Sequence, residues 1–174
     1  MSVDLVTRHN KVVNEQDAVW VLGDIAMGNT VKNLNWAAQC VGHKTLLTGN
    51  HDKNFRRGGV ERTGWDMKYA DLGGFETVLH GTHKVELSSG EVVLVSHFPY
   101  TNADHTDDRY ASMRPADDGQ TWLLHGHVHE KWRQRGRMIN VGVDAWGGAP
   151  VSEDTILELI AGGPKELAPL PWTL

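Results

Sequence analysis

The sequence predicts an α/β fold, in which helices alternate with strands of a sheet. A continuous apolar run over residues 18–22 and a segment over residues 44–48 (Lys-Thr-Leu-Leu-Thr) each stop at a glycine, as buried strands do. Amphipathic segments at residues 3–13 and 31–41 precede these runs. The order helix, strand, helix, strand is the α/β pattern. A length of 174 residues favours one domain with its own core, so we expect a single domain over residues 1–174.

Each element of the first half has its own signal. The apolar positions 3, 5, 6, 12 and 13 recur at helical spacing, which predicts the first helix. In the second predicted helix, Leu34 and Ala37 share one face, and Thr30 is the expected N-cap. Residues 53–65 are expected to form a loop.

From residue 75 onward the sequence predicts a series of short strands instead of alternating helices and strands. They are expected at residues 75–80, 83–87, 91–96, 122–124 and 138–143. Ser89-Gly90 predicts a hairpin turn, and Arg135-Gly136 predicts another. Ser152 is expected to cap a helix that runs to residue 160, and an extended tail follows from residue 168. Residues 100–120 read as a long charged loop.

Composition excludes several classes of protein. No run of about 18 apolar residues indicates a membrane span, and the N-terminus lacks a signal-peptide pattern. Cys40 is the single cysteine, so we expect a reducing, cytoplasmic location and no disulfide framework. A net charge of −5 disfavours polymeric nucleic acid as a partner. Phosphate esters stay open as substrates, because bound divalent cations would invert the charge locally.

Four fragments carry candidate metal ligands. They are Gly23-Asp24, residues 49–52 (Gly-Asn-His-Asp), His97 before Phe-Pro, and residues 126–129 (Gly-His-Val-His). Each follows a predicted strand or stands beside a glycine. Ligands of open α/β sheets gather beyond the carboxyl ends of the strands, so these side chains are expected to meet in space.

The donor types indicate a borderline divalent metal. Carboxylate, amide oxygen and imidazole without thiolate suit manganese, iron, cobalt, nickel or zinc. Asp24 has two oxygens and can bridge two ions about 4 Å apart. His51 is then placed to donate a proton to a leaving oxygen, and Asp52 to orient that imidazole. Taken singly, each motif has a purely structural alternative, such as an exposed strand face for His127 and His129.

Taken together and in this order, the motifs resemble the calcineurin-like metallophosphoesterase superfamily, over residues 18 to about 146. Residues 8–10, 97–100 and 140–144 resemble a compact prokaryotic and phage branch. The resemblance implies a four-layer αββα sandwich around a dinuclear centre. It implies that Asp24 bridges both ions, that Asn50, His97 and His127 complete one ion's ligands, and that His129 binds the other. It also implies that His51 is the catalytic histidine.

The chain departs from the family pattern at its start. Metallophosphoesterases begin with a strand that carries Asp-x-His, and Asp4 and His9 do not reproduce that spacing. We therefore expect the N-terminal strand of the sandwich to be missing, with one metal held firmly and the second weakly or not at all. A truncated chain and a naturally shortened variant both account for this departure.

Several other residues can be interpreted either as part of a functional site or as structural. Arg109 and Arg114 are expected to clamp a substrate phosphate, or else to belong to a solvated charged loop. The remaining ones, for which a structural role is favoured or equally consistent, are His105, Arg56, Arg57, His125, Asp144 and Trp146.

The sequence thus predicts a metal-dependent phosphoesterase that hydrolyses a small phosphodiester or phosphomonoester with a metal-activated hydroxide. Cyclic nucleotides are substrates by resemblance only. The alternative is a catalytically impaired metal- or phosphate-binding module, because two ligands are absent. A nuclease acting on long polymers is disfavoured by the acidic balance. Oligomeric state is not indicated.

Overall fold

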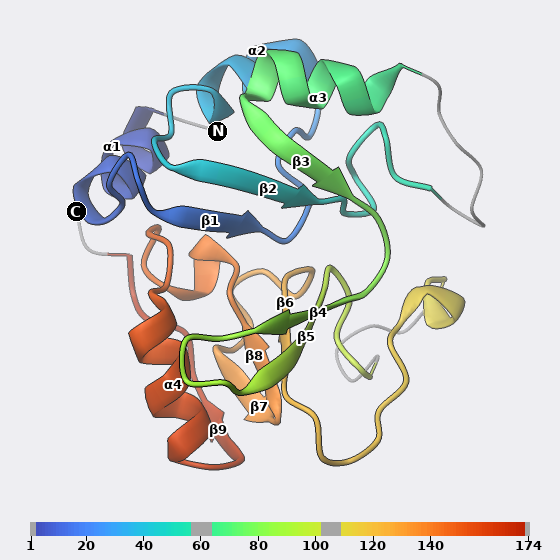
Figure 1. Ribbon diagram of the computed structural model, residues 1–174, viewed down its shortest axis with the longest axis vertical. Coiled ribbons are helices and arrows are strands. Elements are labelled where there is room, and N and C mark those ends of the chain that lie inside the picture. The colour runs from blue at the N-terminus through green and yellow to red at the C-terminus, as the bar shows by residue number, and fades with distance from the viewer. Residues whose placement is uncertain (1–2, 57–63, 102–108, 173–174) are drawn as a thin grey trace. The chain divides into compact units, whose positions relative to one another are not determined.

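The computed structural model describes residues 3–56, 64–101 and 109–172, and it has a mixed α/β fold (Figure 1). The chain divides into two compact units, residues 1–80 and residues 81–174, and each contains one sheet. The α/β class predicted from the sequence is confirmed. The prediction that residues 1–174 form one domain stays a prediction.

Helices and strands alternate through the first unit. The elements are α1 (Val3–Val12), β1 (Ala18–Val21), α2 (Thr30–Ala37), β2 (His43–Leu47), α3 (Trp65–Gly73) and β3 (Phe75–Leu79). The strands form a parallel sheet in the order β1-β2-β3. The alternation of helices and strands favours parallel pairing. Between two parallel strands the chain must cross back to the end of the sheet where the first strand began, and a helix usually makes this connection.

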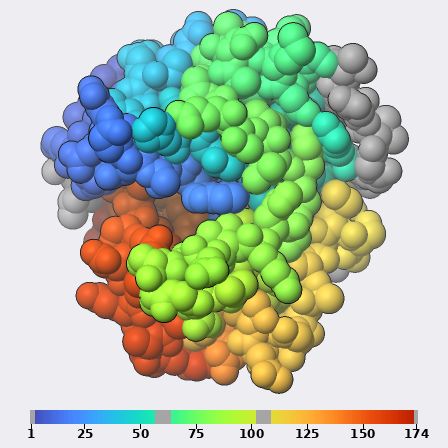
Figure 2. Space-filling model, viewed as in Figure 1, coloured from blue at the N-terminus to red at the C-terminus, as the bar shows by residue number. Residues whose placement is uncertain are grey.

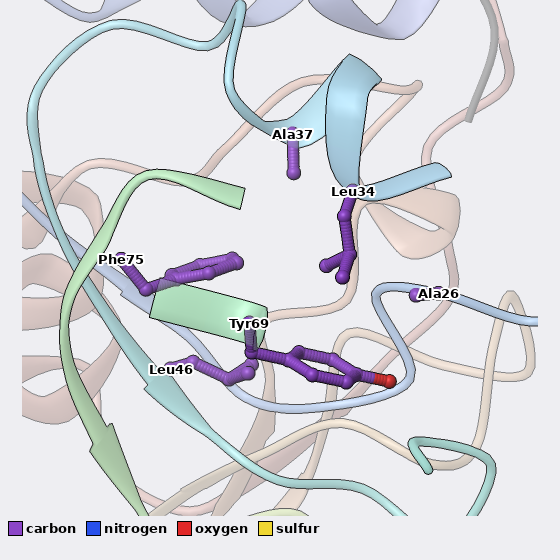
Figure 3. Packing of buried hydrophobic residues seen from close by; sticks show 6 residues of the cluster. All are labelled: Ala26, Leu34, Ala37, Leu46, Tyr69 and Phe75. Atoms are coloured by element: carbon purple, nitrogen blue, oxygen red, sulfur yellow. The ribbon is translucent and has the colours of Figure 1, made fainter. Parts of the chain in front are cut away.

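The core of the first unit lies between this sheet and helices α2 and α3. Leu34 and Ala37 from α2 and Tyr69 from α3 pack with Leu46 and Phe75 (Figure 3). Figure 3 shows the Tyr69 hydroxyl on the side of the cluster where Ala26 lies. Burial of these side chains holds both helices on the sheet, and it leaves one polar group, the Tyr69 hydroxyl, in need of partners.

Lys44 lies at the start of the strand that was predicted to be buried, and it is 5% exposed. Its Nζ donates to the carbonyl oxygens of Ala37 at 2.7 Å, Cys40 at 2.8 Å and Gly73 at 3.2 Å. The last carbonyls of a helix lack partners within it, so one ammonium group satisfies the ends of α2 and α3 together. Burial lowers the pKa of Lys44.

Two predictions for this unit were wrong. The N-cap of α2 is Asn29, whose side chain accepts from the Lys32 N–H, and the helix ends at Ala37 rather than residue 41. Helix α3 was not foreseen. It begins after Gly64, which makes no side-chain capping bond, so the usual start signal is lacking. Of the predicted loop 53–65, residues 57–63 lie outside the described part of the chain.

The second unit contains a mixed sheet in the order β4-β5-β6-β8-β7-β9. The strands are β4 (His83–Glu86), β5 (Val92–Ser96), β6 (Leu123–His125), β7 (Gln134–Gly136), β8 (Met138–Asn140) and β9 (Lys165–Leu167). Strands β5, β6 and β8 are parallel, and the other pairs are antiparallel. Two 3-10 turns, η2 (Ala111–Met113) and η3 (Val143–Ala145), and helix α4 (Glu153–Ala161) complete the unit.

The turn and cap predictions for this unit fit the structure. Gly90 has a φ of 84° in the β4–β5 hairpin, whose turn lies on the visible surface in Figure 2. Ser152 caps α4 by accepting from the Thr155 N–H. Strand β9 was not foreseen; its three residues pair with β7 just before the tail that was expected to be extended.

Within the described residues, none of the helices combines the length and the apolar character that crossing a membrane requires.

Candidate functional site

In the first unit, two turns carry the predicted ligands. Gly23 and Asp24 follow β1 with φ angles of 91° and 57°. A non-glycine residue at positive φ is uncommon, and aspartate is among the types that tolerate it. The Oδ1 of Asp24 accepts from the backbone N–H of His51 at 2.8 Å. The carboxylate predicted to bridge two metals and the turn that holds Asn50 are therefore in direct contact.

Asp52 organises both of these turns. Its Oδ2 accepts from the N–H groups of Asp24 at 2.8 Å and Gly49 at 2.9 Å. Its Oδ1 accepts from the Ala26 N–H and the Tyr69 hydroxyl, each at 3.3 Å. The residue is 3% exposed. A carboxylate that accepts several backbone bonds fixes the backbone around it. The prediction that Asp52 orients the His51 imidazole stays a prediction.

Tyr69 is the link between Asp52 and helix α3. Its hydroxyl donates to Asp52 and accepts from the Lys53 N–H at 3.0 Å. Burial and the neighbouring Asp52 carboxylate raise the pKa of Tyr69. The hydroxyl thus stays protonated, which keeps it a donor to the carboxylate.

A second polar network lies beside these turns. His80, directly after β3, hydrogen-bonds the Thr48 hydroxyl through its Nδ1 (2.9 Å) and donates from its Nε2 to Asp66 (3.0 Å). Arg56 and Asn54 also donate to the Asp66 carboxylate, at 2.8 and 2.9 Å. Arg56 is therefore engaged in an ion pair rather than placed on a bare exposed turn. Arg57 lies outside the described residues.

In the second unit, His97 and His127 lie together. They follow the neighbouring parallel strands β5 and β6, in which Ser96 pairs with His125. The His97 Nε2 and the His127 Nδ1 are 3.3 Å apart. Two nitrogens that bind one ion at about 2.0–2.1 Å lie roughly 3 Å from each other. The pair therefore has the spacing that two ligands of one metal need.

Aromatic rings enclose these two histidines. Phe98 lies edge-on to both imidazoles, with centroids 4.9 Å from each, and Tyr110 stacks on Phe98 at 5.0 Å. The Arg109 guanidinium lies 5.8 Å from the centre of the Tyr110 ring. Such packing restricts the imidazole rotamers, so the two nitrogens keep their spacing.

Arg114 has a structural contact of its own. It donates from one nitrogen to the Pro99 and Thr101 carbonyl oxygens, at 3.1 and 3.0 Å. These bonds tie the segment after η2 to the chain that follows His97. The predicted roles of Arg109 and Arg114 toward a substrate stay predictions. His105 lies outside the described residues.

His125 is wholly buried and packs against Trp132, with ring centroids 4.9 Å apart. Its Nδ1 donates to the Gly126 carbonyl oxygen at 2.7 Å. Burial lowers the pKa of His125 to about 3, and the neighbouring charges of His97 and Arg114 act in the same direction. Of the alternatives for His125, the structure therefore supports packing rather than surface exposure. With its pKa lowered in this way, the imidazole is neutral near pH 7.

His127 and His129 both have positive φ angles, 69° and 51°. The buried side chain of Asn140 holds this turn: its Nδ2 donates to the carbonyl oxygens of His129 at 2.7 Å and Trp132 at 2.8 Å. Trp146 donates from its indole to the Asn140 carbonyl oxygen. Sequence reasoning missed this clamp, although an asparagine at the end of a strand beside a ligand-bearing turn is a usable signal.

His129 lies beside Asp144, which belongs to the turn η3. Its Nδ1 is 3.5 Å from the Asp144 Oδ2. Together with Glu130 these residues offer three ligand atoms within 4.8 Å of one another. Glu130 is a second residue that the sequence did not single out.

The chain is similar to two phage proteins. It is 36% identical over 163 residues to the Gene 66 protein of Mycobacterium phage L5, covering 87% of this chain and 76% of that protein. It is 34% identical over 160 residues to the Gene 66 protein of Mycobacterium phage D29, covering 85% and 77%.

A solved structure is also similar. The crystal structure of a protein of unknown function from Aquifex aeolicus matches with a TM-score of 0.64 and 25% identity, covering 90% of this chain and 83% of that one. No protein-family model matches the chain.

Proposed function

The chain belongs to the family of the mycobacteriophage Gene 66 proteins, and we propose that it is a metal-dependent phosphoesterase acting on a small phosphodiester or phosphomonoester. The observation that supports this most is the His97–His127 pair, whose nitrogens are 3.3 Å apart at the ends of adjacent parallel strands. The four-layer αββα sandwich is part of the proposal, which is supported by the presence of one sheet in each unit.

The donor set fits a divalent metal. In the second unit His97 and His127 offer two imidazoles, and in the first unit Asp24 and Asn50 offer oxygens. The metals would be manganese, iron, nickel, cobalt or zinc. When bound, such ions supply a nucleophile from water at neutral pH and polarise a phosphoryl oxygen.

The chain's own residues do the remaining work. The contact from His51 N–H to Asp24 Oδ1 places His51 directly beside the carboxylate that would hold the metals. Its side chain is exposed, so it is accessible to donate a proton to the leaving oxygen. Asp52 keeps both turns in place through its four hydrogen bonds.

The test is hydrolysis of bis(4-nitrophenyl) phosphate and of 4-nitrophenyl phosphate by the purified chain with Mn²⁺. We expect release of nitrophenolate that depends on Mn²⁺ and is lost in His97→Ala. A chain that binds Mn²⁺ but hydrolyses neither ester at a rate above that of His97→Ala would instead favour the metal- or phosphate-binding module.

A further inference from the structure

Three side chains of the second unit converge outside the His97–His127 pair. His129, Glu130 and Asp144 each offer one ligand atom, and these atoms all lie within 4.8 Å of one another. They lie beyond the ends of two adjacent parallel strands, β6 and β8. His125 of β6 pairs with Asn140 of β8, and His129 and Asp144 each follow four residues later. The parallel register therefore brings the imidazole and the carboxylate to the same place.

The spacing within this cluster suits a shared ion better than a direct bond. The His129 Nδ1 and the Asp144 Oδ2 are 3.5 Å apart. An N–H···O hydrogen bond usually spans about 2.7–3.2 Å, so this separation is too long for a good one. Two ligands that bind one ion at about 2.0–2.2 Å are separated by roughly 3 to 3.5 Å when the angle between them is near-tetrahedral.

Backbone contacts fix both ligands. The carbonyl oxygen of His129 accepts from the buried Asn140 amide at 2.7 Å, and the Asp144 carbonyl oxygen accepts from the Trp172 indole at 3.2 Å. Asp144 belongs to the 3-10 turn η3, which closes through the bond from Ala145 N–H to Gly142 O. The backbone that carries His129 and Asp144 is thus held in place before any ion arrives, which reduces the entropic cost of binding.

Charge favours the same conclusion. Glu130 and Asp144 bring two carboxylates close together, and a divalent cation between them would carry the opposite charge. One imidazole and two carboxylates form a mixed donor set of the kind that zinc and manganese accept, with water able to complete the shell because His129 and Glu130 are exposed.

We propose that His129, Glu130 and Asp144 form a divalent-metal site within the second unit. The inference rests on the proposed function only for the role of His129 as a ligand, and it adds Glu130 and Asp144 as ligands of that ion. Being exposed and built from three protein ligands, the site binds more weakly than the one that includes His97 and His127.

The test is a calorimetric titration of Mn²⁺ into the wild-type chain and into Glu130→Gln and Asp144→Asn. We expect a tight and a weaker class of sites in the wild type. Each variant should lose at least about tenfold in affinity of the weaker class, since removing even an outer contact of a metal site costs that much. The tight class should persist in both variants, which also reports that they fold.

Glu158→Gln is the matched control, because Glu158 is an exposed residue of α4 in the same unit. A wild type with one class of sites, or variants that bind both classes as the wild type does, would overturn the proposal. Ester hydrolysis is measured on the same samples. Absence of hydrolysis with an intact weaker class counts against the proposed function alone.

Discussion

The Asp52 carboxylate accepts a 2.8 Å hydrogen bond from the backbone N–H of Asp24, which ties the turn after β1 to the turn after β2. The same oxygen accepts from Gly49, so one buried charge holds the backbone on both sides of the proposed metal ligands. The geometry of Asp24 and Asn50 thus depends on a residue that need not touch the metal at all.

Replacing Asp52 by Asn should destabilise the fold. The amide keeps the shape but loses the charge, and its NH₂ group faces backbone donors that then lack acceptors. Loss of charge-assisted bonds of this kind costs about 1.5–3 kcal/mol each in the least compensated case. We expect a loss of about 2–4 kcal/mol in the free energy of unfolding, measured by urea denaturation.

Asp71→Asn is the control for this change, because Asp71 is exposed on α3. Its effect should stay within about 0.5 kcal/mol. Equal stability of the two variants would mean that the Asp52 contacts contribute nothing net.

His51→Ala should separate turnover from metal binding. The side chain is exposed and only its backbone N–H contacts Asp24 in the bond described, so the carboxylate keeps that partner in the variant. General acid catalysis typically contributes about 10²–10⁴-fold to a rate. We expect hydrolysis of bis(4-nitrophenyl) phosphate to fall by that order while bound Mn²⁺ is unchanged. His43→Ala, an exposed histidine of β2, should hydrolyse at the wild-type rate; unchanged turnover in His51→Ala would remove His51 from the mechanism.

Lys44→Met should lower the free energy of unfolding, because methionine cannot donate hydrogen bonds to the carbonyl oxygens that the Lys44 ammonium group binds. The carbonyl oxygens of Ala37, Cys40 and Gly73 would lose the Lys44 donor, while that of Ala37 keeps its bond from the Cys40 N–H. An unsatisfied buried polar group costs about 1–3 kcal/mol, so we expect a loss of about 2 kcal/mol or more in the free energy of unfolding, measured by urea denaturation. Lys32→Met, on the exposed side of α2, is the comparison; if both variants unfold alike, the three bonds have no net worth.

Asp66 should make stability depend on acid pH. Burial raises the pKa of Asp66, but hydrogen bonds from His80, Asn54 and Arg56 outweigh it and hold the pKa below 3.8. A carboxyl group with a lowered folded-state pKa contributes stability above its unfolded pKa and loses it as pH falls through the folded value. The urea midpoint of the wild type should therefore drop below about pH 5 more steeply than that of Asp66→Asn. Parallel curves for the two proteins would contradict the assignment.

Much of the fold followed from local pattern. Segments that end at a glycine, residues 18–22 and 44–48, located β1 and β2, and Ser152 located the start of α4. Helix α3 was missed because Gly64 offers no side-chain cap, and β9 because Lys165-Glu166-Leu167 contains no apolar run. The strand that contains Lys44 was predicted from the sequence. The residues around Lys44 in the sequence did not indicate that its ammonium group would donate to carbonyl oxygens at the ends of two helices.

The sequence by itself determined which residue types stand after which strands: Asp24, Asn50, His97, His127 and His129 are placed by glycine turns and strand ends that local chemistry dictates. Only the tertiary structure decided their partners. Asp52 receives bonds from residues 28 positions away, and Asp144 reaches His129, because parallel pairing sets the register between strands distant along the chain. Local preference acts over a few residues, whereas register is chosen by the packing of whole sheets.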